Sequence, residues 1–179
     1  LIDEINRAPA KTQAALFEVM EERQNPIDGQ TQKLSPPFMV LATQNPIEQE
    51  GTYALPEAQL VRFLFKIYVD YPPISHEIEI LQSHQNRKNQ DPVSLVKSVL
   101  TAKKIHEAQE KRFAVKTEAN ILHYIAELVG KTRNHPYLFL GASPRASLAI
   151  LNAAKVFDAI NGRDFVIPED VKKTLKPVL

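Results

Sequence analysis

The sequence predicts an α/β region followed by an all-helical region, and three observations lead to this fold class. Two apolar runs flank an amphipathic pattern in the first 73 residues, which gives the order strand, helix, strand. From residue 74 onward, apolar residues recur at helical spacing and strand signals are sparse. Because the pair Pro72-Pro73 interrupts both patterns, we expect two domains, residues 1–73 and residues 74–179.

The α/β region opens with Leu1-Ile2, which we interpret as the end of a buried strand. A helix is expected from Pro9 or Ala10 to about Arg23, because apolar residues recur there every three or four positions. The stripe consists of Ala15, Leu16, Val19 and Met20. We expect this stripe to face the core of the region.

The rest of this region alternates turns with apolar runs. A hairpin is expected over 25–37, because Asp28-Gly29 is a favoured turn dipeptide. The continuous apolar run 38–46 is typical of a strand buried on both faces of a parallel sheet. A short helix with Pro56 in its first turn is expected over 55–63, and a further strand over 63–73.

The helical region should contain at least five helices. They are expected at 75–85 with Ser75 as the cap, at 93–112 with a break near Thr101, at 117–133, at 141–162 and from Pro168 onward. The third presents Ile121, Leu122, Ile125, Leu128 and Val129 on one face. The fourth has Ser143 as N-cap, Pro144 at its first position and Gly162 at its end.

Composition excludes several classes of function. The formal net charge is +1, so no overall field attracts nucleic acid or an anionic membrane. The 179 residues contain no cysteine, which rules out disulfides and thiolate metal sites within them. No apolar run reaches the roughly 18 residues that span a bilayer. We expect a cytoplasmic protein with no membrane insertion and no nucleic-acid partner.

The acidic pair Asp3-Glu4 follows the first apolar residues, at the end of the first expected strand. Ligands of α/β sheets bind beyond the carboxyl ends of the strands. An aspartate there can bind Mg²⁺ and an adjacent glutamate can deprotonate an attacking water. The alternative is that both residues merely favour the dipole of the helix that follows.

Polar residues also end the second apolar run. Asn45 could reach the same water or a γ-phosphate, because an amide both donates and accepts hydrogen bonds. The alternative is an ordinary Asn-Pro turn. Two polar strand ends in one crevice are less expected by chance than either alone.

Two arginines complete the set of candidates. Arg62 could stabilise transition-state charge on a neighbouring subunit's nucleotide, or form a surface salt bridge. Arg145 lies in the first turn of the helix at 141–162, where a cation opposes the helix dipole. A phosphate is the obvious ligand for an arginine in that position.

Four stretches together resemble the MoxR group of AAA+ ATPases, in matching order and spacing. They are DEINRAP, KTQAALFEVMEERQ, LATQNPIEQEGTYALPEAQL and GASPRASLAIL. The resemblance implies a partial AAA+ core with a hairpin inserted before sensor 1 at 25–37, and a helical lid at 74–179. It implies a hexameric ring that uses ATP and Mg²⁺ to remodel or mature client protein complexes, including clients with von Willebrand factor A domains.

The resemblance also implies a role for each candidate residue. Asp3 corresponds to the Walker B magnesium ligand and nucleotide contact, and Glu4 to the residue that activates water. Asn45 corresponds to sensor 1. Arg62 corresponds to the arginine finger, and Arg145 to the sensor 2 arginine that binds nucleotide and assists catalysis.

Two departures from the family pattern stand out. Val61 replaces the usual aspartate before Arg62, which removes an orienting partner of that arginine. The phosphate-binding pattern G-x-x-x-x-G-K-[ST] is also absent from these residues. We therefore interpret the chain as roughly the second half of an AAA+ module, starting within the Walker B strand, and expect it to be inactive alone. The alternatives are a magnesium-chelatase-like or helicase-like AAA+ motor, or a non-catalytic helical interaction domain.

Overall fold

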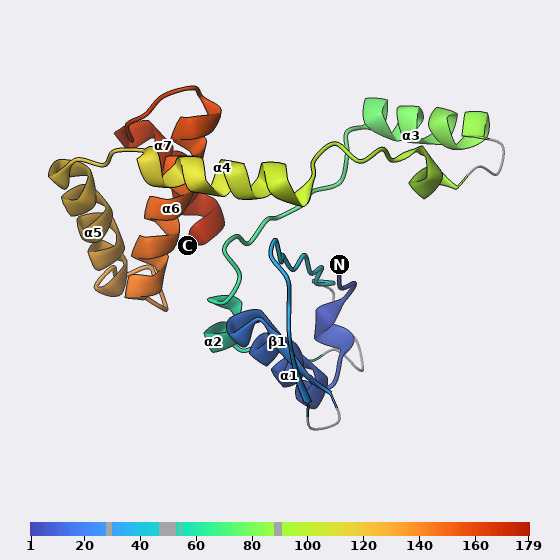
Figure 1. Ribbon diagram of the computed structural model, residues 1–179, viewed down its shortest axis with the longest axis horizontal. Coiled ribbons are helices and arrows are strands. Elements are labelled where there is room, and N and C mark those ends of the chain that lie inside the picture. The colour runs from blue at the N-terminus through green and yellow to red at the C-terminus, as the bar shows by residue number, and fades with distance from the viewer. Residues whose placement is uncertain (28–29, 47–52, 54, 88–90) are drawn as a thin grey trace.

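The computed structural model describes residues 1–27, 30–46, 53, 55–87 and 91–179 (Figure 1). The N-terminal part contains the short helix η1 (Ile5–Arg7), α1 (Ala10–Glu22), the strands β1 (Gln24–Ile27) and β2 (Gln30–Lys33), and α2 (Glu57–Leu60). Figure 1 shows these elements grouped together, with an extended segment leading from α2 to the helical part.

Helix α1 begins and ends close to the expected residues, but it buries a different face. Gln13 and Phe17 are its buried residues, whereas Ala15 of the expected stripe is exposed. Phe17 packs with Ile5 and Leu55 in a small core, which Leu16 and Met20 border. A polar residue is tolerated on this face because the Gln13 amide donates to the carbonyls of Ile5 and Ala8, at 3.3 and 3.1 Å.

The hairpin expected at 25–37 is confirmed. Strands β1 and β2 are antiparallel, with Gln24 opposite Lys33 and Ile27 opposite Gln30. The expected turn residues Asp28-Gly29 lie outside the described residues. All four residues of β2 are exposed, so the hairpin projects from the surface and does not extend a buried sheet.

The expected buried strand at 38–46 is wrong in most of its length. In this run only Ala42 forms a bridge, parallel to Ile2, and Met39 and Leu41 are 76% and 55% exposed. The buried strand end expected at Leu1-Ile2 is limited to the same bridge, and Leu1 is 93% exposed. Apolar composition records a preference for burial, but a strand also needs a hydrogen-bonded neighbour along its length. Within the described residues, that neighbour extends only from Ile2 to Ile5.

The strand expected at 63–73 is also wrong. Residues 65–73 have no regular secondary structure and form no ladder with any described residue, and Val69 and Tyr71 are 90% and 97% exposed. One backbone bond, from Lys66 N to Pro177 O at 2.7 Å, ties this segment to the last helix. The segment therefore connects the N-terminal elements to the helices without adding a strand.

The helical part follows the sequence prediction more closely. Its helices are α3 (Ile74–Arg87), η2 (Pro92–Leu95), α4 (Ala102–Ala114), α5 (Ala119–Arg133), α6 (Pro144–Ile160) and α7 (Pro168–Val178). A helix does begin after Thr101, because the Thr101 hydroxyl accepts from Lys104 N and caps α4. The helix expected from residue 93 to this break is wrong, because only the short η2 forms there and residues 96–101 are not helical. Ser75 lies inside α3 and does not cap it. In this part of the structure, α3 stands well apart from α5, α6 and α7 (Figure 1).

Helix α6 is the centre of the helical core and packs against α4, α5 and α7. Pro144 occupies its first position, and Gly162 follows it with φ of 72°, as expected. Ser143 precedes the helix but makes no capping hydrogen bond. The buried core residues are Val115, Ile121, Ile125, Val129, Ile150, Ala154, Val166 and Val171. Leu122, which we expected on this face, is 45% exposed.

A buried acidic pair links α6 to α7. Asp158 and Asp170 are 0% and 1% exposed, and Arg163 lies 3.3 Å from the first and 2.7 Å from the second. Burial raises the pKa of the Asp158 carboxyl, and the charges of Asp170 and Asp164 add to this rise while Arg163 opposes it. Asp170 also accepts from Ile167 N at the start of α7, so this network fixes the turn between the helices.

None of the described helices is long and apolar enough to cross a lipid bilayer.

Candidate active site

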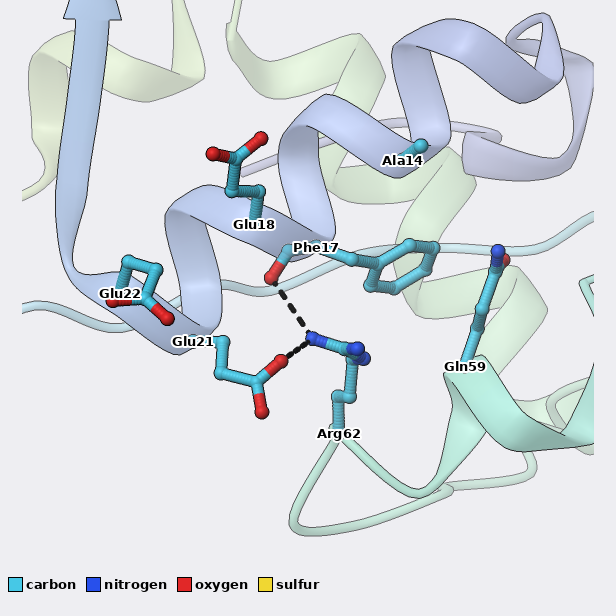
Figure 2. A pocket seen from close by; sticks show the side chains of 7 residues that line it. All are labelled: Ala14, Phe17, Glu18, Glu21, Glu22, Gln59 and Arg62. Atoms are coloured by element: carbon cyan, nitrogen blue, oxygen red, sulfur yellow. Dashed lines mark hydrogen bonds and ion pairs between the residues drawn. The ribbon is translucent and has the colours of Figure 1, made fainter.

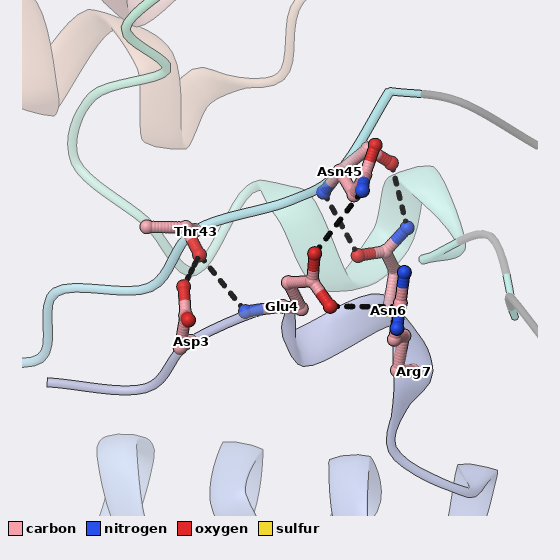
Figure 3. Close-up of polar contacts among 6 residues, drawn as sticks. All are labelled: Asp3, Glu4, Asn6, Arg7, Thr43 and Asn45. Carbon is pink, nitrogen blue, oxygen red and sulfur yellow. Dashed lines mark hydrogen bonds and ion pairs between the residues drawn. The ribbon is translucent and has the colours of Figure 1, made fainter.

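A short parallel pairing brings the acidic pair next to the second polar strand end. Ile2 N donates to Leu41 O at 2.8 Å, Thr43 N to Ile2 O at 2.9 Å, and Ile5 N to Thr43 O at 3.0 Å. Parallel strands end at the same edge of a sheet. Asp3 and Glu4 therefore lie beside Thr43 and Asn45, as Figure 3 shows.

The Thr43 hydroxyl connects the two acidic residues. It accepts a hydrogen bond from Glu4 N at 2.8 Å and donates one to Asp3 Oδ1 at 2.5 Å. Asp3 is exposed, so one of its carboxylate oxygens is oriented by Thr43 while the group faces solvent. This arrangement holds the carboxylate in one direction without burying its charge.

Glu4 is held at both carboxylate oxygens. Asn45 Nδ2 donates to Oε1 at 3.1 Å, and Arg7 Nε lies 2.7 Å from Oε2. The backbone of Glu4 has φ of 46°, a left-handed conformation that costs free energy for a residue with a side chain. The Thr43 hydroxyl bond and the buried Ile5 that follows hold this conformation in place.

The asparagine pair fixes the position of Asn45. Asn6 Nδ2 donates to Asn45 O at 2.9 Å, and Asn45 N donates to Asn6 Oδ1 at 3.2 Å (Figure 3). Asn6 is 8% exposed, so this reciprocal pair is protected from competing water. Asn45 is thus held through its backbone while its side chain reaches Glu4.

The oxygen donors of this site suit Mg²⁺ but do not form a complete cage. Among the described residues, no group of three or more His, Cys, Asp or Glu side chains could hold a metal ion. Mg²⁺ usually takes one or two protein carboxylates and completes its shell with water and phosphate oxygens. The exposed, oriented carboxylate of Asp3 fits that requirement.

Arg62 lies elsewhere, against helix α1. Its Nη1 contacts the carboxylate of Glu21 and donates to Phe17 O at 3.3 Å (Figure 2). These residues and Gln59 line an open cavity of about 280 Å³ whose other lining residues are Ala14, Glu18 and Glu22. The salt bridge that the sequence left open is therefore present for Arg62.

Arg145 lies in the first turn of α6 and approaches the same glutamate. Its Nη2 is 3.7 Å from Glu21 Oε1, and its side chain is 63% exposed. Within the described residues, Arg62 and Arg145 thus pair with Glu21 and not with Asp3 or Glu4. The structure brings the predicted residues Asp3, Glu4 and Asn45 together. The two predicted arginines lie at a different location, beside Glu21 on α1.

Sequence reasoning missed four residues of these two places. Thr43, Asn6 and Arg7 hold the acidic pair and Asn45, and Glu21 holds both arginines. Thr43 and Asn6 adjoin residues that the motifs singled out, so their proximity was a usable signal. No local signal identified Glu21, because it is one of three glutamates within five residues of α1.

Two family models match the chain. Residues 1–65 match the model described as ATPase family associated with various cellular activities (AAA), and residues 130–179 match the model described as AAA lid domain. The first match contains Asp3, Glu4, Asn45 and Arg62, and the second contains Arg145.

Similar proteins match over almost the whole chain. The uncharacterized protein YeaC of Bacillus subtilis (strain 168) is 45% identical over 96% of this chain and 53% of its own length. Chaperone MoxR1 of Mycobacterium tuberculosis (strain ATCC 25618 / H37Rv) is 44% identical over 100% of this chain and 48% of its own length. The chain therefore spans about half the length of these relatives.

A solved structure shares the arrangement described above. A crystal structure of a candidate ATPase from Cytophaga hutchinsonii ATCC 33406 is 38% identical and superposes with a TM-score of 0.90. The match covers 99% of this chain and 56% of that one.

Proposed function

Because this chain belongs to the MoxR family of AAA+ ATPases, we propose that the full-length protein hydrolyses ATP at a site containing Asp3, Glu4 and Asn45. The observation that carries the proposal is the position of the Glu4 carboxylate. Asn45 and Arg7 hold its two oxygens, and Thr43 links its backbone to Asp3. A carboxylate held in this way can accept a proton in one defined direction.

The roles of the three residues follow from their chemistry. Each Glu4 oxygen has a second lone pair, so it can accept a proton from water while Asn45 and Arg7 stay bound. Asn45 holds the Glu4 carboxylate in position through its side-chain amide. Asp3 is the residue that would bind Mg²⁺, which when present neutralises charge on the phosphate oxygens.

The two arginines suggest an assembled enzyme. In this proposal Arg62 and Arg145 interact with nucleotide phosphates at the interface of a ring, which we take to be a hexamer. Support comes from the contacts of Arg62, which is held on α1 and paired away from the Asp3-Glu4 site of its own chain. An arginine supplied by a neighbour stabilises transition-state charge strongly in related phosphoryl-transfer enzymes.

Phosphate binding needs a further element. The 179 residues contain no G-x-x-x-x-G-K-[ST] pattern, so we propose that these residues alone do not hydrolyse ATP. The full-length protein would supply a phosphate-binding loop from another part of its sequence. The division into a core at 1–73 and a lid at 74–179 belongs to the same proposal.

The biological role that we propose is remodelling or maturation of client protein complexes in the cytoplasm. It is supported by the similarity to a relative named as a chaperone. Clients with von Willebrand factor A domains are the partners we would test first, on the resemblance to the MoxR group.

The test is Glu4→Gln in the full-length protein. We expect turnover to be abolished and ATP affinity to be retained, because the glutamate acts on water and not on the nucleotide. Phosphate release measures turnover, and calorimetry measures ATP affinity. Glu18→Gln, an exposed change on α1, is the matched control and should behave as the parent does. Preserved turnover with weakened ATP affinity would exchange the roles given to Asp3 and Glu4. If the unsubstituted full-length protein showed no ATPase activity, the alternative of a non-catalytic helical interaction domain would be favoured.

A further inference from the structure

We propose that Glu21 is a positioning residue shared by the two arginines, with one carboxylate oxygen holding Arg62 and the other tethering Arg145. This inference rests on the proposed function, in which both arginines act on nucleotide phosphates. It adds a residue that neither the sequence motifs nor the chemistry of the Asp3-Glu4 site singled out. Both arginines form their ion pairs with this one residue.

Arg62 is fixed on α1 from two sides. Its Nη1 contacts Glu21 Oε2 and donates to Phe17 O at 3.3 Å, and neither contact uses Nε or Nη2. The next residue, Phe63, packs edge-on against the Phe17 ring with the ring centroids 6.1 Å apart. The base and the tip of Arg62 are therefore both held, while the other guanidinium N–H groups remain able to bind an anion.

Glu21 takes the place of the orienting partner that residue 61 does not supply. Val61 has no carboxylate and is 49% exposed, so it cannot hold the guanidinium of Arg62 by charge. Glu21 supplies that charge from a helix that lies 41 positions away in the sequence. Without this partner the Arg62 side chain would sample more conformations and lose more entropy on binding an anion.

The second oxygen of Glu21 connects the N-terminal elements to the helical part. Oε1 lies 3.7 Å from Arg145 Nη2, in the first turn of α6. The pairing with Arg145 is the looser of the two, because it is longer than the contact with Arg62 and the Arg145 side chain is 63% exposed. An anion that attracts Arg145 would release this tether and leave Glu21 to Arg62 alone.

Two neighbouring glutamates provide matched controls. Glu18 and Glu22 line the same cavity on the same helix, but they form no ion pair with any described residue. Figure 2 shows a dashed line from Arg62 to Glu21 and none from Arg62 to Glu18 or Glu22. Glu22→Gln therefore removes the same charge from the same helix turn without removing a contact to either arginine.

The first measurement is steady-state ATP hydrolysis by the full-length protein. Glu21→Gln should lower kcat by about 10- to 100-fold, because a misdirected catalytic group typically costs that much. KM for ATP should change by less than about threefold, because Arg145 is freed and remains able to bind phosphate. A purely structural role would reduce the active fraction and leave both constants of the remaining enzyme unchanged.

The second measurement does not depend on ATPase activity. The substitutions Lys11→Cys in α1 and Leu148→Cys in α6, both at exposed positions, allow spin labels to report the distance between these helices. Full-length subunits carrying both labels are diluted with unlabelled subunits, so that each measured distance lies within one subunit. Without nucleotide, Glu21→Gln should broaden the distance distribution and Glu22→Gln should not.

The outcomes separate the two proposals. A fall in kcat together with a broader distribution supports the shared role of Glu21. A kcat equal to that of Glu22→Gln, in an enzyme that Arg62→Ala inactivates, overturns the role toward Arg62, and an unchanged distribution overturns the tether. A parent that does not hydrolyse ATP defeats the proposed function instead, and the distance measurement then decides whether Glu21 holds the helices together.

Discussion

The hydroxyl of Thr43 provides a sharp test of the candidate active site. Thr43→Val keeps the shape of the side chain but removes the hydrogen bond to Asp3 Oδ1 and the acceptor of Glu4 N. Both acidic residues lose their common support at once, and Glu4 must hold its left-handed backbone without it. We expect the Mg²⁺-dependent turnover of the full-length enzyme to decrease while the protein stays folded.

The size of the decrease in kcat/KM follows from the hydrogen bonds that Thr43→Val removes. A hydrogen bond to a charged group contributes about 1.5–3 kcal/mol when it is shielded. Asp3 and Thr43 are exposed, so water recovers part of this free energy. We therefore expect a loss of about 1–2 kcal/mol, which corresponds to a decrease in kcat/KM of about 5- to 30-fold.

The assay measures phosphate release as a function of ATP and Mg²⁺ concentration. Thr43→Val should also raise the Mg²⁺ concentration for half-maximal rate, because Asp3 is no longer held in one orientation. Thr43→Ser keeps the hydroxyl and should stay close to the parent in both quantities. A Thr43→Val enzyme within twofold of the parent, or a Thr43→Ser enzyme as impaired as Thr43→Val, would refute the reasoning.

Two further predictions concern the arginines and the helical core. Rings mixed from Arg62→Ala subunits and Glu4→Gln subunits should recover ATPase activity that neither shows alone, because one subunit's Glu4 then meets its neighbour's Arg62; no recovery would contradict a finger supplied by a neighbour. Because burial raises the pKa of Asp158, the folded state binds a proton more tightly than the unfolded state. The free energy of unfolding should therefore fall as pH rises from the ordinary aspartate pKa to this raised value. Urea unfolding at several pH values should show that Asp158→Asn removes this fall. The same pH dependence in Asp158→Asn and the parent would contradict the assignment to Asp158.

The sequence by itself determined the local elements of this protein. Helices α1, α5, α6 and α7 were predicted within a few residues, because the spacing of apolar residues lies within each segment and prolines mark the starts of α1, α6 and α7. The hairpin was predicted from the turn dipeptide Asp28-Gly29, which is also a local signal. The meeting of Asp3, Glu4 and Asn45 was also predictable, since polar ends of parallel strands share one edge.

The tertiary structure alone decided which residues hold these groups. Runs 38–46 and 63–73 are apolar enough for strands, but a strand needs a partner that composition cannot specify. Glu21 resembles Glu18 and Glu22 in sequence, and only the packing of α1 against Phe63 and Arg62 distinguishes it. Contacts between residues about 40 positions apart depend on the tertiary fold of the chain, and no local sequence pattern predicts them.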